Sequence, residues 1–150
     1  MTLRIRRAAL QDLEAVVPLF DAYRMFYGQS SDPQRARDWL RARTEAGESV
    51  VLLAERDGAV VGFVQLYPMF TSVGTARTWI LNDLYVDASA RRGGVARALL
   101  DAAAEFARND GARSIVLETT RDNDAARALY RNAGWNEDQT QWYSLSLAGR

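Results

Sequence analysis

The sequence predicts an α/β fold in which a mixed β-sheet carries helices on both faces. Two apolar runs meet at a central Asp-Gly turn, which indicates an antiparallel hairpin in the first half of the chain. Strands and helices alternate in the second half, which favours α/β packing. The length of 150 residues suits a single core, so we expect one domain over residues 1–150, without internal repeats.

The first elements are a strand, two helices and the hairpin. Apolar side chains at near-helical spacing predict a helix over 11–26, and Pro18 is expected to kink or break it. Asp32 and Pro33 are typical of a helix start. The expected order is β-α-α-β-β-β-α-β-α-β: strand 3–8, helix 11–26, helix 33–45, two strands within 48–67, strand 75–87, helix 94–109, strand 113–120, helix 124–133 and strand 140–147.

Three residue types are absent, and their absence excludes several kinds of chemistry. The chain has no cysteine, no histidine and no lysine. Disulfides, Cys/His zinc sites, cysteine nucleophiles and Ser-His-Asp triads are therefore excluded, and we expect no metal. The 19 basic and 19 acidic residues balance, so neither nucleic acid nor a membrane is an expected partner. Without a recognisable signal peptide or spanning segment, a cytoplasmic location is expected.

The stretch ARRGGVARALL (90–100) places adjacent glycines at the start of the helix over 94–109. A helix N-terminus offers about four unpaired N–H groups and about half a positive charge. Gly93 and Gly94 leave these groups accessible to a bulky anion, and Arg91, Arg92 and Arg97 add positive charge. These features predict a phosphate or diphosphate site. The alternative is a tight turn before a solvated basic helix.

Four motifs in the second half of the chain together resemble the GNAT superfamily of acyl-CoA-dependent N-acyltransferases. RRGGVA is similar to its Arg/Gln-x-x-Gly-x-Gly/Ala signature, with Arg91, Gly94 and Ala96 at the defined places. LNDLYVD resembles its central strand, and SIVLETTRDN resembles the strand that follows. NDAARALYRNAGW (123–135) resembles its Asn-x-x-Ala-x-x-Leu-Tyr-x-x-x-Gly-Phe/Trp helix. The resemblance is strong over 78–147.

The resemblance implies a splayed sheet that binds acetyl-CoA as co-substrate. The central strand and the next strand would separate at the glycine turn, with the diphosphate on the amides of 92–97 and the pantetheine arm paired with the backbone of 84–86. The implied cofactor contacts are Leu84, Tyr85, Val86, Arg91, Arg92, Gly93, Gly94, Val95, Ala96, Arg97, Asn123, Ala126 and Tyr130.

The family reaction implies direct attack of a primary amine on the thioester. The resemblance assigns the Val86 backbone N–H to the developing oxyanion and Tyr130 to the leaving thiolate as general acid. Tyr130 could instead pack within its helix and contact CoA without proton transfer. Asn123 could contact the pantetheine arm, cap its helix, or do both.

The general base is left open by the sequence. Asp83 lies in the apolar run WILNDLYV and is our first candidate, because a carboxylate there needs an explanation. It could take the ammonium proton through water or orient the acceptor. Glu118, at the end of the next expected strand, is the competitor. A structural hydrogen bond at Asp83, or a reaction with no single base, is the alternative.

The acceptor pocket is expected near FDAYRMFYGQSSD (20–32). Tyr23, Phe26 and Tyr27 could hold a cationic amine by cation–π contacts, together with a nearby aspartate, Asp21 or Asp32. The alternative is an ordinary helix–helix core. LYPMFTSV (66–73), where a strand is expected to end at Pro68, is another candidate wall.

The leading hypothesis is a bacterial N-acetyltransferase that modifies a polyamine, a protein lysine or a small aminated metabolite. One alternative is a non-catalytic module that binds and senses acyl-CoA. Another is an interaction subunit whose last strand, QWYSLSL, pairs with a second chain. A homodimer is a candidate assembly.

Overall fold

The computed structural model describes residues 2–148. The chain folds as two compact units, one ending at Glu118 and the other beginning at Thr119. Two short 3-10 turns, Leu10–Asp12 and Ala88–Ala90, precede α1 and α3. The first unit contains β1 Leu3–Arg7, α1 Leu13–Phe26, α2 Pro33–Glu45, β2 Val50–Arg56, β3 Ala59–Thr71, β4 Ala76–Val86, α3 Val95–Asn109 and β5 Ser114–Val116; the second contains α4 Asp124–Asn132.

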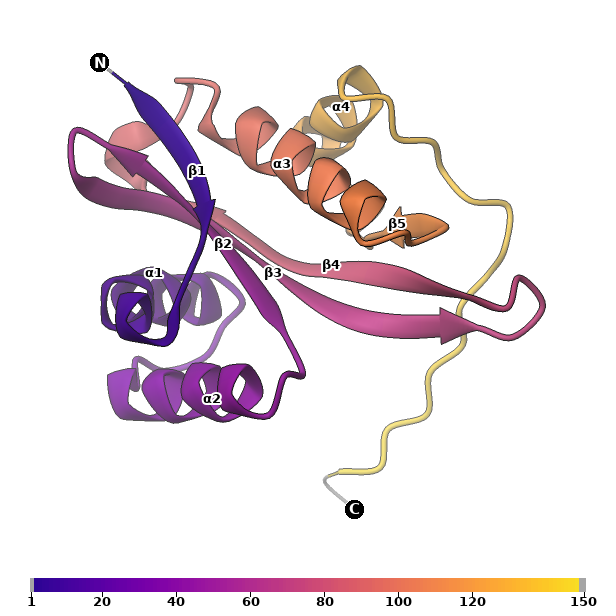
Figure 1. The fold of residues 1–150 in the computed structure, drawn as a ribbon, viewed down its shortest axis with the longest axis horizontal. Helices are drawn as coiled ribbons and strands as arrows, with labels where there is room; N and C mark the ends of the chain where they lie inside the picture. The colour runs from indigo at the N-terminus through magenta and orange to yellow at the C-terminus, as the bar shows by residue number, and fades with distance from the viewer. Residues whose placement is uncertain (1, 149–150) are drawn as a thin grey trace. The chain divides into compact units, whose positions relative to one another are not determined.

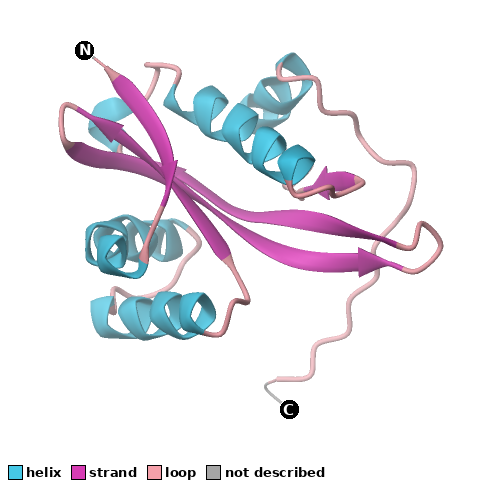
Figure 2. Cartoon of the chain, in the orientation of Figure 1, coloured by secondary structure: helices cyan, strands magenta, loops and turns pink. Residues whose placement is uncertain are grey.

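The first unit is a five-stranded mixed sheet with helices on both faces, which confirms the predicted fold class. The strand order is β1-β2-β3-β4-β5; β1 to β4 are antiparallel to their neighbours, and β5 is parallel to β4. Helices α1 and α2 cover one face and α3 covers the other (Figures 1 and 2). The core under α1 and α2 includes Val16, Leu40, Leu53 and Phe63, all fully buried. This packing holds the middle of the sheet rigid from both sides.

The β2–β3 hairpin forms at the predicted turn. Asp57 and Gly58 have φ angles of 53° and 81°, the two left-handed residues that a tight turn of the primed type requires. Aspartate and glycine are among the few residues that adopt this conformation at little cost. The turn therefore starts the pairing of β2 with β3, the strand that lies beside β4.

Two expected ends of elements at prolines do not occur: α1 is not broken at Pro18, and β3 does not end at Pro68. Helix α1 continues through Pro18, whose ring lies on the exposed side while Val16, Val17 and Leu19 are buried. Strand β3 does not end at Pro68 but runs to Thr71. The partner strand β2 begins opposite Leu66, so β3 has a free edge at Pro68, where a missing N–H breaks no ladder bond.

The predicted strand over 140–147 does not form. Residues 135–140 and 141–148 contain no helix or strand, and the side chains of Trp142, Tyr143, Leu145 and Leu147 are 75–90% exposed. Alternation of apolar and polar residues indicates which face of a strand would be buried, but a strand also needs a neighbour to accept its hydrogen bonds. No described strand supplies that neighbour.

Strand β5 is also shorter than predicted, at three residues in place of 113–120. It pairs with Thr78–Ile80 of β4 and no further. No helix among the described residues is long and apolar enough to cross a membrane.

Candidate functional site

Strand β4 has an unpaired edge over its second half. The β4–β5 ladder stops at Ile80, so from Leu81 to Val86 no described strand lies on that side of β4. The backbone N–H of Asp87 donates to Val61 O of β3 at 2.8 Å. Since successive backbone groups of a strand point to opposite sides, those of Val86 and Leu84 point to the unpaired side. The edge can therefore accept another extended chain.

Part of this edge is already used by Arg91. Its Nε donates to the Val86 carbonyl at 3.0 Å, and its guanidinium lies 5.4 Å from the centre of the Tyr85 ring. Tyr85 is paired with Phe63 of β3, so its own backbone groups face β3. Of the predicted strand contacts, the Leu84 backbone and the Val86 N–H are thus the groups that remain for a ligand.

The glycine turn opens α3 without a side-chain cap. Gly94 has φ 79°, and the space where its Cβ would stand is open to 4 Å. Arg92 is also left-handed, at φ 69°. The N–H groups of Val95 and Ala96 have no acceptor among the described residues, and the first N–H bonded within the helix is that of Ala98, to Gly94 O at 3.0 Å. These amides are therefore open to an acceptor from outside the described protein residues.

Packing against the sheet fixes this helix end. Val95, Leu99 and Ala103 are buried at 1% exposure or less. A Cβ at Gly62 of β3 would stand 3.2 Å from Leu99 Cδ1 and 3.3 Å from Val95 Cγ1. The missing side chain of Gly62 therefore allows α3 to lie close to β3, beside the unpaired edge of β4.

The turn also contains an arginine that the sequence analysis did not select. Arg56, at the end of β2, donates from Nη2 to Gly93 O at 3.3 Å, and a Cβ on Gly93 would come within 2.8 Å of the same nitrogen. Gly93 thus makes room for a guanidinium, while Gly94 makes room for a ligand. Arg56 is distant in sequence from the turn, so no local pattern could indicate it.

These residues fit the diphosphate and amide arm of a CoA thioester. The amides of Val95 and Ala96 lack acceptors among the described residues, and the space at Gly94 is open. The Arg56 guanidinium contacts this turn through Gly93 O, and Arg92 is part of the turn itself. The described residues contain no group of three or more His, Cys, Asp or Glu that could hold a metal ion.

Asp83 lies at an irregularity of β4. Gln65 pairs with Asp83 and Leu66 with Leu81, so Asn82 is an extra residue, a β-bulge. Asp83 is 4% exposed and accepts hydrogen bonds from Gln65 Nε2 at 2.5 Å and Asn82 Nδ2 at 2.9 Å. Burial raises the pKa of this carboxyl, and the hydrogen bonds oppose that effect only in part.

The amide of Gln65 leaves one polar atom unused beside Asp83. Its Oε1 is buried and has no hydrogen-bond donor among the described residues. A buried acceptor without a donor costs free energy, so it favours a nearby group that brings a proton. Beside Asp83 there is therefore a buried hydrogen-bond acceptor that no described residue satisfies. Glu118, the competing candidate, is exposed at the end of the unit.

The two aspartates near the aromatic segment have structural roles. Asp21, 7% exposed, accepts from Ser31 Oγ at 2.7 Å and from Asp32 N at 2.8 Å. Asp32 caps α2 by accepting from Arg35 N at 3.1 Å. Both carboxylates hold the α1–α2 connection. Asp21 is buried in this role, which counts against its contact with an amine, whereas Asp32 is exposed and its candidate role stays a prediction.

The aromatic residues of α1 divide into one packed ring and two exposed rings. Tyr23 lies against Phe20, Phe63 and Tyr85, and its hydroxyl donates to Asn82 O at 3.1 Å. The side chains of Phe26 and Tyr27 are 68% and 61% exposed. Tyr23 is thus placed beside the β4 bulge, whereas Phe26 and Tyr27 are not drawn into the core.

The second unit holds the remaining predicted residues on or next to α4. Asn123 caps this helix, with Oδ1 accepting from Ala126 N at 3.2 Å, which bears out its structural interpretation. Tyr130 is half-buried and lies 6.4 Å from the Trp135 ring, centre to centre. Within the unit, Trp135 N donates to Tyr130 O at 2.9 Å and closes the helix end.

Comparisons with known proteins identify the family to which this chain is similar. Residues 13–135 match the acetyltransferase (GNAT) family. The chain is 47% identical over 136 residues to an N-acetyltransferase of Bacillus subtilis (strain 168), YhfO, with 91% of each chain covered. It is 30% identical over 121 residues to a probable acetyltransferase of Haemophilus influenzae, covering 80% of this chain and 83% of that one.

A solved structure extends the likeness to three dimensions. The crystal structure of a probable acetyltransferase superposes with a TM-score of 0.93 at 41% sequence identity, covering 98% of this chain and 99% of the other. A match at that coverage extends over nearly the whole of both chains.

Proposed function

Because the chain belongs to the GNAT acetyltransferase family and is therefore an acyl-CoA-dependent acetyltransferase, we propose that it transfers acetyl from acetyl-CoA directly to a primary amine. The acceptor would be a polyamine, a protein lysine or a small aminated metabolite. Bound acetyl-CoA would supply an activated acetyl thioester, and the protein's own residues would bind it and manage the protons.

One observation carries this proposal: open amides at the start of α3 lie at the end of an unpaired strand edge. The N–H groups of Val95 and Ala96 would bind the diphosphate, and the helix dipole would favour its charge. The Leu84 backbone and the Val86 N–H would pair with the amide arm. The proposed binding groups are thus mainly backbone atoms, with the arginines of the turn adding positive charge.

The Val86 N–H is also our candidate for stabilising the developing charge on the acyl oxygen. It points to the unpaired side of β4 and precedes the turn that orients the carrier. A fixed N–H donor at a water-poor site stabilises such a charge more than water does. Arg91 supports this geometry indirectly, because its bond to the Val86 carbonyl holds the next peptide group, between Val86 and Asp87, in place.

Proton transfer is assigned to Asp83 and Tyr130. An alkylammonium has a pKa of about 10.4 and must lose a proton before its nitrogen can attack. Asp83 is suited to accept that proton, since burial raises its pKa. Tyr130 would protonate the leaving sulfur. This role rests on its position in the motif that resembles the family.

The test is a panel of polyamines, lysine peptides and amino sugars with acetyl-CoA, followed by release of free thiol. We expect release with at least one amine. Tyr130→Phe should lower kcat by roughly 100-fold or more while the KM for acetyl-CoA changes little. Tyr143→Phe is the matched control, because Tyr143 is in the same unit and 90% exposed.

The outcomes separate the competing functions. Uptake of acetyl-CoA in calorimetry without thiol release from any amine would favour the sensing module over the enzyme. Full activity of Tyr130→Phe would remove the general-acid role and leave the rest of the proposal standing.

A further inference from the structure

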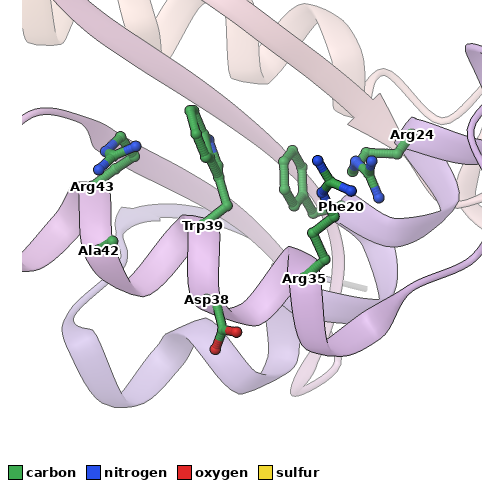
Figure 3. Close-up of a pocket in the computed structure, with 7 residues that line it drawn as sticks. All are labelled: Phe20, Arg24, Arg35, Asp38, Trp39, Ala42 and Arg43. Carbon is green, nitrogen blue, oxygen red and sulfur yellow. The ribbon is translucent and has the colours of Figure 1, made fainter.

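A cavity of about 480 Å³ opens beside α1 and α2, on the face of the sheet opposite α3 (Figures 1 and 3). Its lining includes three arginines, Arg24, Arg35 and Arg43, and two aromatic rings, Phe20 and Trp39. This composition differs from what a polyamine or any other simple cation would select. An excess of guanidinium groups beside aromatic walls is typical of sites for oxyanions on an organic body.

The charge in this cavity is not compensated by the protein. Neither Arg24 nor Arg35 forms an ion pair with a described residue, and Arg24 Nη1 is buried without a hydrogen-bond acceptor. A buried charged donor without an acceptor is costly, and native proteins rarely retain one without a reason. Figure 3 draws both arginines among the residues that line the cavity. Both guanidinium groups therefore bring N–H donors to the same cavity.

The carboxylate in the lining does not neutralise them. Asp38 accepts from Gln34 Nε2 at 2.8 Å, and in Figure 3 it points away from Arg24 and Arg35. Arg43 differs from these two arginines because its charge is paired: its Nε donates to Glu48 Oε1 at 2.8 Å. The cavity arginines without an ion-pair partner among the described residues are therefore Arg24 and Arg35, and only Arg24 has a buried nitrogen without an acceptor.

The aromatic wall is held in a fixed orientation. Trp39 is 46% exposed, yet its Nε1 donates to Tyr67 Oη at 3.2 Å and its ring lies 4.4 Å from the Arg43 guanidinium. An exposed ring that is held on both sides loses little entropy when a ligand packs on it. Trp39 can thus serve as a rigid apolar surface next to the arginines.

The cavity is one aromatic layer away from Asp83. Phe20 stacks on Tyr23, centres 6.3 Å apart, and the Tyr23 hydroxyl donates to the backbone carbonyl of Asn82, the neighbour of Asp83. On the Trp39 side, burial is the main cause of the raised pKa of Tyr67, and the negative charge of nearby Asp83 adds to it. A molecule anchored in the cavity could therefore extend toward the proposed base.

We infer that Arg24 and Arg35 bind a carboxylate or phosphate group of the acceptor, so that the substrate carries an oxyanion as well as its reacting amine. This inference rests on the proposed function. It narrows the three acceptor classes to small aminated acids and phosphates, or to a protein amine beside an acidic group, and it disfavours polyamines.

The experiment compares amines that differ only in the anion. ω-Amino acids from β-alanine to 6-aminohexanoate are each paired with their primary amide, and O-phosphoethanolamine is paired with ethanolamine. We expect kcat/KM for the charged member of at least one pair to be roughly 10- to 100-fold higher, as charged hydrogen bonds imply. The carboxylate and phosphate series show which oxyanion the site prefers.

Three variants test which residues cause the discrimination. Arg24→Gln and Arg35→Gln should each reduce the charged-to-neutral ratio severalfold or more. Arg35 is an exposed residue of α2, so its replacement does not depend on core packing. Arg41→Gln is the matched control, because Arg41 lies on the same helix outside the cavity, paired with Glu45 at 3.6 Å. It should leave the ratio unchanged.

The outcomes separate this inference from the proposed function. Thiol release with a ratio near one in every pair, or with a ratio unaffected by both variants, overturns the inference and leaves the enzyme intact. If no amine is acetylated, calorimetric titration with the same acids shows whether the cavity binds an oxyanion. Binding that Arg24→Gln and Arg35→Gln weaken supports the oxyanion site and counts against the enzyme; no binding of any acid overturns the site.

Discussion

Helices α2 and α3 belong to the same unit and begin in opposite ways. At α2, Asp32 accepts from the Arg35 N–H and Pro33 has no N–H to satisfy, so the protein closes its own helix end. At α3, Gly94 provides no cap, and the amides of Val95 and Ala96 have no acceptor among the described residues. The closed end supports the fold, and the open end is available to a ligand.

The difference has an energetic basis. Loss of an N-cap costs a helix about 1 kcal/mol. Helix α3 offsets such a cost by burying Val95, Leu99 and Leu100 against the sheet, whereas α2 buries only Ala36 and Leu40. A helix with a large apolar face can leave its first amides open, and a helix with a small one needs its cap.

The largest effect is expected from Gly94→Ala. Its Cβ would enter the open space over the α3 amides, so we expect roughly 10- to 100-fold weaker binding of CoA in calorimetry, the loss of one or two charge-assisted hydrogen bonds. Gly111→Ala is the control, since Gly111 follows the same helix with the same φ of 79° and an equally open surrounding. Equal losses of affinity in both variants would mean that backbone strain, and not the site, is responsible.

A smaller effect is expected from salt. Because the turn is surrounded by arginines, raising NaCl from 20 to 500 mM should weaken CoA binding by roughly fivefold to tenfold. Pantetheine, which lacks the diphosphate, serves as the control and should bind with little salt dependence. A salt response shared by both ligands would argue against a diphosphate contact at the turn.

The capped start of α2 should show the opposite pattern, in which stability falls and the affinity for CoA hardly changes. Asp32→Ala removes the α2 cap, and we expect the free energy of unfolding in urea to fall by about 1 kcal/mol. The affinity for CoA should stay within twofold of the parent. A loss of CoA affinity as large as that of Gly94→Ala would remove the distinction between the two helix ends.

The smallest expected effect is a change in how the free energy of unfolding depends on pH. It arises from the titration of Asp83. Its pKa in the folded state is raised, so between the unfolded value near 3.8 and the raised value the folded state binds more protons, and stability falls as pH rises. Asp83→Asn removes this decline, and its stability relative to the parent should increase between pH 4 and pH 7 in denaturation experiments.

Asp12→Asn is the control of opposite sign. Hydrogen bonds from Arg6 and from the Ala9 N–H lower the pKa of Asp12 to about 2, and this stabilisation is present above the unfolded value and lost as pH falls toward 2. The loss of stability caused by Asp12→Asn should therefore be constant between pH 4 and pH 7. A constant effect of Asp83→Asn over the same range would contradict the buried environment of Asp83.

Features encoded by a few adjacent residues could be predicted from the sequence. The Asp-Pro start of α2, the Asp57-Gly58 hairpin and the glycine turn of α3 are all present in the structure. Each depends on the conformational preference of two or three neighbouring residues, which a sequence displays directly.

Features that depend on distant partners could not be predicted. The bulge at Asn82 arises from the register between β3 and β4, and the position of Arg56 on the glycine turn arises from strand pairing. Asp21 was considered for amine binding because its partners, Ser31 and Asp32, could not be identified from composition. The strand over 140–147 was predicted from alternation alone, without knowledge of a neighbouring strand.

The most direct test follows the backbone amides themselves. In nitrogen–proton NMR spectra of the labelled protein, CoA should shift the Val95 and Ala96 signals strongly, and it should leave the Gln34 and Arg35 signals at the start of α2 nearly unmoved. Saturating CoA that leaves the two α3 amides in place, or that shifts both helix ends equally, would contradict the account.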